Sequence, residues 1–542
     1  MKIIVLYINN LMDQIISTEN EQFKEKYPEI MKKVSIKKLS SMEPTMEEIN
    51  KVSNIIYDYI KKNKRKTYGG FTLNKLLVTK NPSLAIYDEF DTPDVEFYSS
   101  NPLEDLVKIC DKLFSLGYSN VIGQEAQHKE TYSIFVNNQL YCDITYMPSN
   151  IYNKTRFIQT DGINLIHPWF MMIDFFRMFT DPMTSFWRLE KHVSRYLKLQ
   201  KVYPLPLISK PLSGFNISDN ELNQTINLLQ DFLSEIDSII FTGFYVYNYY
   251  LKYTKYTHKD NRFKQISIPY LEVYSTNYVE DGLNIIKYLD GLNNSLSSKI
   301  SRKEFYPFFQ FYGYNCVFYF DTPDGQIPIL YFYSNNKKCI PFKQVPYIKF
   351  DNNKNNYKTL QKQINIGSFD FNILHALIIL AKIRVDDDND WNDIIYTLIN
   401  CYVGFRKHYF ESSNLNLYDS SIFEGFVVEY KGKYVSADRE RRELIQQRKK
   451  QGKPLVYRYE PNSNSSNSSN PTDPTNPTNP TNPTNPTNPT NPTNIQKKWY
   501  FANSSGNEIL KNNNLKLTEE NLIRENSGLE LKDLIEEDEG KI

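Results

Sequence analysis

Three acidic residues in the first third of the chain have the spacing that two-metal phosphoryl transfer requires. Asp94 and Glu96 lie two positions apart in the alternating stretch 94–98, so on a β-strand both carboxylates point to one face. Asp143 lies in a second alternating stretch, residues 140–146. Carboxylates that converge from neighbouring strands can bind two divalent cations, and hard oxygen ligands suit Mg²⁺ or Mn²⁺. We therefore expect Asp94, Glu96 and Asp143 to be metal ligands and catalytic residues.

A pair of glycines precedes these acids. Gly70 lies 24 positions before Asp94 (94 − 70), at the start of the helix-like segment "GGFTLNKLL". Glycines allow a close backbone approach, so the amides of Gly69 and Gly70 and the hydroxyl of Thr72 are candidates to contact a triphosphate at a helix N-terminus. Taken singly, a D-x-E strand is more often solvated surface and a Gly-Gly pair is usually a turn. The glycine pair followed by the three acids, in this order along one chain, is a more specific indication of a nucleotide site than either motif alone.

The elements that position the acids can be predicted from the residues around them. Stretch 94–98 alternates as a half-buried strand. The next segment starts a helix with Asn101 as N-cap, Pro102 at the first helical position and Glu104 closing a capping box, and Gly117 ends it. Two strands follow, residues 131–136 and 140–146. The expected pattern is strand, helix and hairpin, with an acid on the second hairpin strand.

The same segment occurs a second time without its first acid. "TPDVEFYSSNPLEDL" (92–106) and "IPYLEVYSTNYVEDG" (268–282) share seven residues, each pair 176 positions apart (269 − 93), and Tyr270 replaces Asp94. "FTGFYVYNYYLKY" (241–253) resembles the glycine segment, with Gly243 alone. "GQIPILYFY" (325–333) resembles "NQLYCDITY" and places Leu330 opposite Asp143. We infer tandem domains, the second catalytically decayed; chance similarity is the alternative.

The ordered set G-G, [DE]-h-[DE]-h, h-[DE]-h resembles the DNA polymerase β-like nucleotidyltransferase superfamily. Its local form, "YGGFTLNKLL…IYDEFDTPDVEFYS…YCDITYMP", is similar to the poly(A) polymerase catalytic subunits of poxviruses and other large DNA viruses, including giant viruses. The resemblance covers residues 60–200 and extends to about 430. The glycine-to-acid spacing is longer than in the general motif, and the insert 78–93 is typical of the viral group.

This resemblance implies a template-independent RNA 3′-end adenylyltransferase that makes poly(A) tails from ATP and releases pyrophosphate. Asp94 and Glu96 would hold both metals, Asp143 the metal that activates the 3′-hydroxyl, and Gly69, Gly70 and Thr72 would meet the triphosphate. The expected partners are an RNA 3′ end and ATP, with a homodimer or a processivity partner left open and no membrane. The expected location is the cytoplasm of an infected cell, with packaging in the virion as a further expectation. The alternatives are another nucleotidyltransferase, adding UMP or CMP or modifying a protein, and a non-catalytic RNA-binding scaffold.

Basic residues form a second group of candidates. Arg188, Lys191 and Arg195 follow an i, i+3, i+7 spacing, which places them on one helical stripe. Arg188 and Lys191 are candidates to bind the nucleotide, or the RNA backbone, because developing phosphate charge needs cations. A solvated basic face is an equally good interpretation. Residues 436–453 form a second basic helical stretch, for which RNA phosphates and solvent are again the two alternatives.

Composition limits the function classes. The 542 residues carry 64 Lys and Arg against 63 Asp and Glu, so no global charge attracts nucleic acid and any basic surface must be local. Five scattered cysteines without a CxxC pair favour reduced thiols over a disulfide scaffold or a zinc site. The first ten residues are expected to form a strand rather than a signal peptide. The apolar run 371–383 predicts a buried helix rather than a membrane span.

The expected architecture is α+β, with tandem nucleotidyltransferase-like domains of mixed sheets and flanking helices, a disordered linker and a small tail. Residues 462–494 contain eight Asn/Asp-Pro-Thr triplets, and proline at every third position prevents both helix and sheet. The predicted segments are an N-terminal region (1–60), the catalytic domain (61–200), the degenerate domain (201–430), the basic helix (431–461), the linker (462–494) and the tail (495–542).

Overall fold

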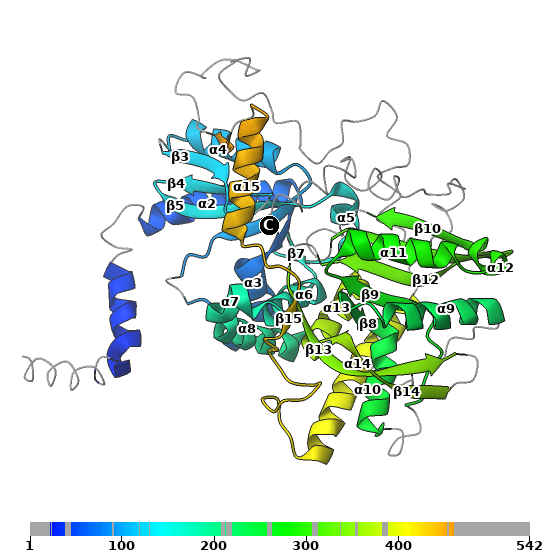
Figure 1. Cartoon of the computed structure of the whole chain (residues 1–542). Coiled ribbons are helices and arrows are strands. Elements are labelled where there is room, and N and C mark those ends of the chain that lie inside the picture. The colour runs from blue at the N-terminus through cyan, green and yellow to red at the C-terminus, as the bar shows by residue number, and fades with distance from the viewer. Residues whose placement is uncertain are drawn as a thin grey trace, which may run out of the picture. The chain divides into compact units, whose positions relative to one another are not determined.

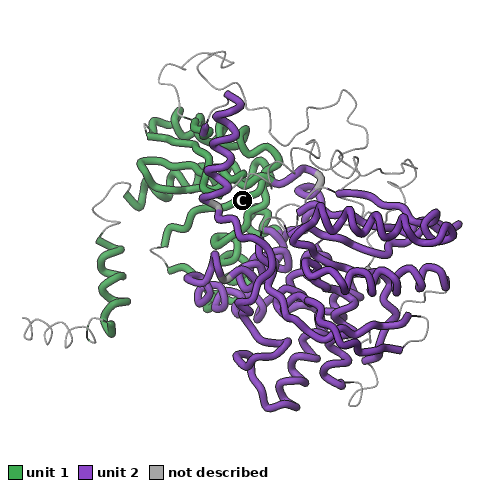
Figure 2. The backbone as a smooth tube through the Cα atoms, viewed as in Figure 1, with its two compact units in different colours: residues 1–146, 159–165, 456–468 green, residues 147–158, 166–455, 469–542 purple. Residues whose placement is uncertain are grey.

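The computed structural model describes two compact units within residues 22–459 (Figures 1 and 2). The description leaves out residues 23, 38–44, 89–90, 119, 129, 208–211, 213–218, 257–262, 306–312, 336–337, 353–355, 382–388 and 453–454. The expected N-terminal strand, the Asn-Pro-Thr linker and the tail lie outside the described residues. The first unit comprises residues 1–146, 159–165 and 456–468, and the second comprises the rest.

The first unit is built on an eight-stranded mixed sheet of order β16-β3-β4-β5-β2-β1-β7-β6. Its strands are β1 (Lys66–Tyr68), β2 (Val95–Ser99), β3 (Val121–Glu125), β4 (Thr131–Val136), β5 (Gln139–Tyr146), β6 (Phe157–Thr160), β7 (Ile163–Ile166) and β16 (Arg458–Tyr459). Its helices are α2 (Met46–Lys62), α3 (Gly69–Lys80), η1 (Pro82–Leu84) and α4 (Pro102–Ser115). The predicted order of strand, helix and hairpin is confirmed.

Helix α4 follows β2 as predicted, but its N-terminus is capped differently. Asn101 is the N-cap residue and Pro102 opens the helix, yet no side-chain cap hydrogen bond forms. Instead the Asn101 backbone N–H donates to Ser99 Oγ at 2.9 Å. Glu104 pairs with Lys108 one turn on, so the predicted capping box is wrong. A buried serine at the end of the strand fixes the turn into the helix.

The second unit is built on a sheet of order β10-β11-β12-β9-β8-β14-β13-β15. Its strands are β8 (Ile239–Thr242), β9 (Leu271–Ser275), β10 (Ile300–Phe305), β11 (Asn315–Thr322), β12 (Gly325–Ser334), β13 (Ile340–Asp351), β14 (Asn356–Gly367) and β15 (Tyr430–Lys431). Its helices are α5 (Ser149–Lys154), α6 (Pro168–Phe179), α7 (Pro182–Ser185), η2 (Phe186–Arg188), α8 (Leu189–Val202), α9 (Asn220–Leu233), α10 (Gly243–Thr254), α11 (Tyr278–Asp290), α12 (Asn294–Ser297), α13 (Phe369–Ala381), α14 (Asn389–Ser413) and α15 (Ala437–Lys450).

The two sheets repeat one topology. In the first, β2 pairs antiparallel with β1 and parallel with β5, and β1 pairs parallel with β7. In the second, β9 pairs antiparallel with β8 and parallel with β12, and β8 pairs parallel with β14. Each central strand, β1 or β8, leads directly into a twelve-residue helix that begins at a glycine. The predicted α+β class with tandem domains is therefore confirmed.

The compact units divide the chain at different points from the predicted domains. Residues 166–200 belong to the second unit, because α6 packs against α13 and α8 packs against α6. Residues 456–468 return to the first unit, where β16 pairs with the edge strand β3. The predicted basic helix is present as α15, and the predicted buried apolar helix is present as α13.

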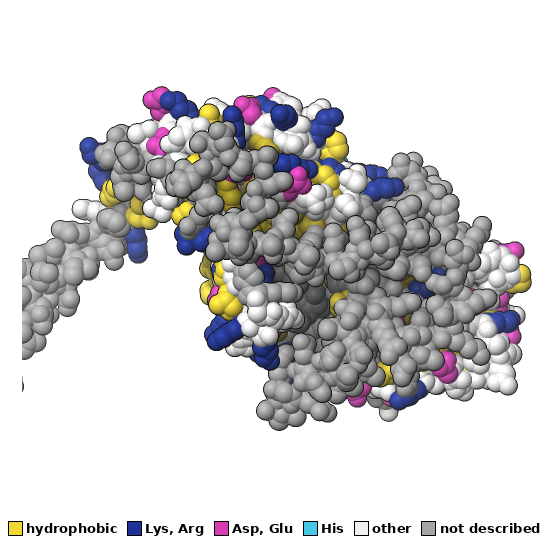
Figure 3. All heavy atoms as spheres, turned by 90° about the horizontal axis from the view of Figure 1, so that it is seen from above, with side chains coloured by type: hydrophobic (Ala, Val, Ile, Leu, Met, Phe, Trp, Pro, Cys, Tyr) yellow, Lys and Arg dark blue, Asp and Glu magenta, His cyan; other side chains and the backbone are white. Residues whose placement is uncertain are grey.

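Charges and thiols are distributed as the composition predicts. On the face shown in Figure 3, the Lys and Arg side chains of the described residues lie among Asp and Glu side chains. All five cysteines are unpaired, and four of them are buried. In the part of the chain that the structure describes, no helix combines the length and the apolar character needed to cross a membrane.

Candidate active site

The strand register of the first unit brings the predicted acids together. Strands β2 and β5 are parallel neighbours, and Glu96 lies directly beside Asp143. Asp94 precedes Glu96 by two residues, at the entry to β2, and therefore projects from the same face. The charge of Asp94 raises the pKa of Asp143, so the two carboxyl groups act on one another. We call these three acids, which face one side of the sheet at the N-terminal end of β2, the acid cluster.

Asp143 is partly buried. Burial raises the pKa of its carboxyl group above the usual range, and the Asp94 charge raises it further. Ser133, directly opposite on β4, donates a hydrogen bond from Oγ to Asp143 Oδ1 at 2.6 Å, which lowers the pKa and offsets part of this rise. Crowded carboxylates in a partly dry site repel one another, and a bound cation relieves that repulsion.

The glycine turn contacts the same cluster. Gly69 begins α3 at a φ of +71°, and a Cβ placed there would lie 1.4 Å from Glu96 Oε2. The Gly70 backbone N–H donates to Glu96 Oε2 at 3.0 Å, and Tyr68, the N-cap residue, makes no side-chain cap bond. Glu96 therefore satisfies the helix N-terminus in this structure, where a free backbone N–H favours an anion.

The remaining predicted residues are placed differently. Thr72 is fully buried, and its hydroxyl donates to Thr67 Oγ1 at 2.7 Å rather than facing the acid cluster. It lies on the side of α3 that packs on the sheet, so its physical role here is to join α3 to β1. Arg188 and Lys191 are exposed residues of η2 and α8 in the second unit.

A row of hydroxyl groups lies two residues further along the strands than the acids, and it was not predicted from the sequence. The rings of Tyr68 and Tyr98 stack with centroids 4.1 Å apart. Tyr68 Oη lies 2.6 Å from Thr145 Oγ1, which lies 2.9 Å from Thr131 Oγ1. Tyr98 and Thr145 follow Glu96 and Asp143 by two residues, so strand alternation alone could have identified this row. Beside it, burial lowers the pKa of Lys66 to about 8.

The donor set suits a divalent cation after a side-chain movement. Three carboxylates on adjacent positions are the hard oxygen ligands that Mg²⁺ and Mn²⁺ prefer. Within the described ranges, no three His, Cys, Asp or Glu side chains already lie close enough to hold a metal ion. Glu96 is turned toward Gly70, so metal ligation by all three acids requires this carboxylate to leave the helix N-terminus.

The second unit repeats this turn and lacks its chemistry. Gly243 begins α10 at a φ of +63°, and a Cβ there would lie 1.8 Å from Glu272 Oε2. Glu272 is therefore the counterpart of Glu96. On the parallel neighbour β12, Glu272 lies beside Tyr331. Tyr331, and not Leu330, thus occupies the position of Asp143, which corrects the prediction by one residue.

Aromatic rings fill the position of the lost acids. Tyr270 and Tyr331, 7% and 9% exposed, meet edge to face with centroids 4.8 Å apart. The retained Glu272 is buried, and its Oε1 lies 3.0 Å from His375 Nε2 on α13. His375 Nδ1 lies 3.2 Å from Tyr274 Oη. Helix α13 and the tyrosines close this face, so it has neither the ligands nor the space for a metal nucleotide.

The second copy retains the polar residues that hold the fold. Ser275 Oγ accepts the Asn277 N–H at 2.9 Å, as Ser99 does for Asn101. Asn164 Nδ2 donates to Lys64 O and Asn365 Nδ2 to Asp237 O, each from the strand parallel to the glycine strand. These serines and asparagines therefore make the same structural bonds in both copies, whereas two of the three carboxylates are lost.

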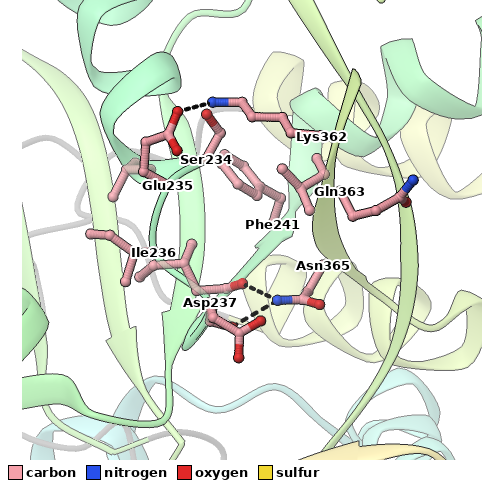
Figure 4. Close-up of a pocket in the computed structure, with 11 residues that line it drawn as sticks. Ser234, Glu235, Ile236, Asp237, Phe241, Lys362, Gln363 and Asn365 are labelled. Carbon is pink, nitrogen blue, oxygen red and sulfur yellow. Dashed lines mark hydrogen bonds and ion pairs between the residues drawn. The ribbon is translucent and has the colours of Figure 1, made fainter. Parts of the chain in front are cut away.

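A cavity of about 160 Å³ lies in the second unit at the N-terminal end of β8, the end away from the Gly243 turn (Figure 4). The Glu235–Lys362 ion pair and Asn365 line it, and the Asn365 amide donates to Asp237 O at 2.8 Å. A bond of the same kind joins Asn164 to Lys64 O in the first unit. It contains no carboxylate cluster like that on β2.

Comparison with known proteins gives consistent matches. The family model described as poly(A) polymerase catalytic subunit matches residues 54–185. A second, described as "APMV, Putative poly(A) polymerase, catalytic subunit, C-terminal", matches residues 198–519. A "Putative poly(A) polymerase catalytic subunit" of Acanthamoeba polyphaga mimivirus is 32% identical over 461 residues, which is 82% of this chain and 78% of that protein.

Two further similarities come from a shorter relative and a solved structure. A protein of the same description from African swine fever virus is 29% identical over 167 residues, 30% of this chain and 35% of the relative. The crystal structure of the Megavirus polyadenylate synthase superposes with a TM-score of 0.71 at 32% identity. That match covers 81% of this chain and 85% of the other.

Proposed function

The chain belongs to the family of poly(A) polymerase catalytic subunits, and we propose that the acid cluster of its first unit carries the chemistry. The protein is a polynucleotide adenylyltransferase of viral type, and the family implies a nucleotide substrate and divalent metal ions. The reaction we propose is attack of an RNA 3′-hydroxyl on the α-phosphate of ATP with release of pyrophosphate. Mg²⁺ or Mn²⁺ would be held by Asp94, Glu96 and Asp143.

One observation carries this assignment. Glu96 lies beside Asp143 on parallel strands, and the Asp94 charge acts on Asp143. The same register in the second unit places tyrosines at both aspartate positions. Two copies of one scaffold therefore differ at the residues that two-metal chemistry needs, and only the first can perform it.

The residues of the first unit have distinct proposed roles. Ser133 orients the Asp143 carboxylate, because its hydroxyl donates to Oδ1. Glu96 contributes a ligand after it leaves the Gly70 N–H, and that N–H is then free to donate to a phosphate oxygen. When bound, the cations would neutralise charge on the phosphates and lower the pKa of the attacking hydroxyl. Positioning and electrostatics supply most of the acceleration.

Primer extension tests this proposal. A short labelled RNA is incubated with ATP, UTP, CTP or GTP separately, with Mg²⁺ or Mn²⁺, against the Asp94→Ala/Glu96→Ala double variant. We expect a ladder of adenylates that falls by at least about 10³-fold in the variant. A wild-type ladder that survives in the variant would place the chemistry elsewhere. A ladder with UTP or CTP alone would keep the acids and reject adenylate transfer.

A matched control comes from the decayed copy. Glu272→Gln keeps the shape of the side chain and an oxygen acceptor at the Gly243 turn, so turnover should stay within about twofold of wild type. Glu272→Ala is a poorer control, because it leaves His375 Nε2 buried without its partner and destabilises the second unit.

Partners follow partly from the family. The description of the relatives as catalytic subunits implies an RNA substrate and a further subunit. A homodimer is a separate proposal, motivated by the retained second unit. Light scattering of the active protein tests it, and a monomer that polyadenylates at the same dilution would reject it.

A further inference from the structure

We propose that Phe186 and Trp187, together with the cations that follow them, form a binding surface for single-stranded RNA. We call this the aromatic–basic surface and define it as Phe186, Trp187, Arg188, Lys191, Arg195 and Lys198. It lies within the second unit, on η2 and α8. The proposal rests on the proposed function, since it assigns a site to the RNA substrate.

The two rings are exposed and held on a fixed turn. The side chains of Phe186 and Trp187 are 66% and 63% exposed, with centroids 5.3 Å apart and planes nearly perpendicular. In the described part of the chain, no other exposed aromatic residues are direct neighbours in sequence. Ser185 is fully buried before them, and its Oγ donates to Asp181 O at 2.6 Å and to Met178 O at 2.9 Å. This buried serine presents the rings on an ordered turn.

The helix that follows concentrates positive charge. Residues 186–202 contain five Lys or Arg and one carboxylate, Glu190, in a chain whose net charge is +1. Arg188, Lys191, Arg195 and Lys198 share one stripe by their i, i+3, i+7, i+10 spacing. The positive charges of Arg188, Lys191 and Arg195 act on the imidazole of His192. Burial and these cations lower the pKa of His192 to about 4.

The face of α8 that packs in the second unit adjoins the basic stripe, and Phe186, Trp187, Arg188 and Lys191 are exposed beside it. Tyr196 packs against Phe176 and Phe179 of α6, with ring centroids 5.5 and 5.8 Å apart. Leu199 is fully buried. The packing face therefore holds the helix, and the exposed residues Phe186, Trp187 and Lys191 take no part in that core.

Exposed aromatic rings beside a line of cations match the chemistry of single-stranded nucleic acid. Every base has a face that stacks on an aromatic ring, and Lys and Arg contact phosphates, so binding tolerates any sequence. An enzyme that extends RNA without a template needs that tolerance. Four cations share this stripe, so a second copy of the same surface would meet like charge, which favours a polyanion such as RNA as the occupant. Residues 186–197 also lie between the two segments that the family models match.

Fluorescence anisotropy with the full chain and a labelled, unstructured 20-nucleotide RNA tests the surface. Phe186→Ala/Trp187→Ala should weaken RNA binding about tenfold or more, since one stacked base contributes roughly 5- to 150-fold. Lys191→Ala/Arg195→Ala should make the dependence of log K on log salt shallower by about 1.4, or about 0.7 for each lost phosphate contact. Exposed residues of the second unit away from the surface, Tyr418→Ala and Lys358→Ala, serve as controls and should bind as wild type does.

An RNA with abasic positions separates stacking from charge. Wild type should lose affinity for the abasic RNA, whereas the double aromatic variant should bind the abasic and the intact RNA equally. The aromatic variant should raise KM for RNA and leave kcat within about twofold at saturating RNA. If the aromatic variant binds intact RNA with wild-type affinity, the surface is not an RNA site and the inference is overturned.

Two further outcomes are distinguishable. A wild-type protein that binds RNA through these rings but adds no nucleotide would reject the proposed function and keep the surface. A wild-type dimer that becomes a monomer in the aromatic variant, with unchanged RNA affinity, would assign the rings to contact with a second copy and reject the surface.

Discussion

Alanine at the first glycine of each copy tests the division of labour between the two units. Gly69 and Gly243 both begin a helix at positive φ, and a Cβ at either would strike the carboxylate of the neighbouring strand, Glu96 or Glu272. The local perturbation is thus nearly the same. We expect both variants to be less stable and Gly69→Ala alone to lose turnover.

The size of each effect follows from the surroundings. An alanine at positive φ costs about 1–2 kcal/mol. In the first unit Glu96 is half-buried and can swing away, losing the Gly70 hydrogen bond at about 1 kcal/mol, for a total of roughly 2–3 kcal/mol. In the second unit Glu272 is buried against His375, and its displacement adds an unsatisfied group at about 1–3 kcal/mol, for a total of roughly 2–5 kcal/mol.

The loss of turnover should be greater for Gly69→Ala than for Gly243→Ala, although Gly243→Ala is expected to cost more stability. Gly69→Ala displaces a proposed metal ligand and fills the phosphate approach, so primer extension should fall by about 100-fold or more. Gly243→Ala should keep adenylate transfer within about threefold of wild type at temperatures where it is folded. Chemical denaturation followed by circular dichroism gives the stabilities, and the primer-extension assay gives the rates.

Gly117→Ala is the matched control for backbone strain. Gly117 has a φ of +95°, and an added Cβ would meet no atom within 4 Å. It should show the conformational cost alone and keep full turnover. A Gly69→Ala protein that polyadenylates normally would refute the reasoning. So would a folded Gly243→Ala protein that loses activity as severely as Gly69→Ala.

Three further predictions concern stability. Glu272→Ala should lower the free energy of unfolding by about 1–3 kcal/mol through the orphaned His375, and Glu272→Gln by less; equal effects in denaturation would mean that the buried pair is unimportant. Burial and Arg156 lower the pKa of His167, which accepts the Trp169 N–H at the start of α6, to about 4. The unfolded chain, with an ordinary pKa of about 6.5, therefore binds more protons between those values, so stability should fall by on the order of 1–2 kcal/mol on going from pH 7 to 5. His167→Asn, which still caps the helix, should make this pH slope shallower in denaturation titrations. A chain ending at residue 455 lacks β16 and should be less stable by roughly 1–3 kcal/mol than one ending at 461, and equal protease resistance of the two would count against a role for β16.

The candidate catalytic acids could be predicted from the sequence because a strand has a period of two. That period places Asp94 and Glu96 on one face whatever surrounds them, and the Gly-Gly pair marks a turn that favours glycine, with Gly69 at a φ of +71°. The repeat was also visible, and its shared serines each accept the backbone N–H of the asparagine two residues later. Local chemistry therefore determined the family, the tandem fold and the candidate acids.

Register was decided only by tertiary pairing. The hairpin β11–β12 has two more residues on each strand than β4–β5, so matching the similar letters near the two turns placed Leu330 opposite Asp143. Parallel pairing with Glu272 places Tyr331 there instead. Side chains of adjacent strands are aligned by hydrogen bonds across the sheet, which no spacing along one strand reveals.

Contacts between distant segments were likewise beyond the sequence. Thr72 faces Thr67 because α3 folds back on its own strand, and Glu96 meets the Gly70 N–H across 26 residues. His375 reaches Glu272 from a helix 103 residues away and helps close the second copy. The sequence by itself determined which residues can perform the chemistry, because side-chain type and strand period are local properties. Tertiary structure decided what each of them contacts, because packing joins segments whose separation along the chain carries no such information.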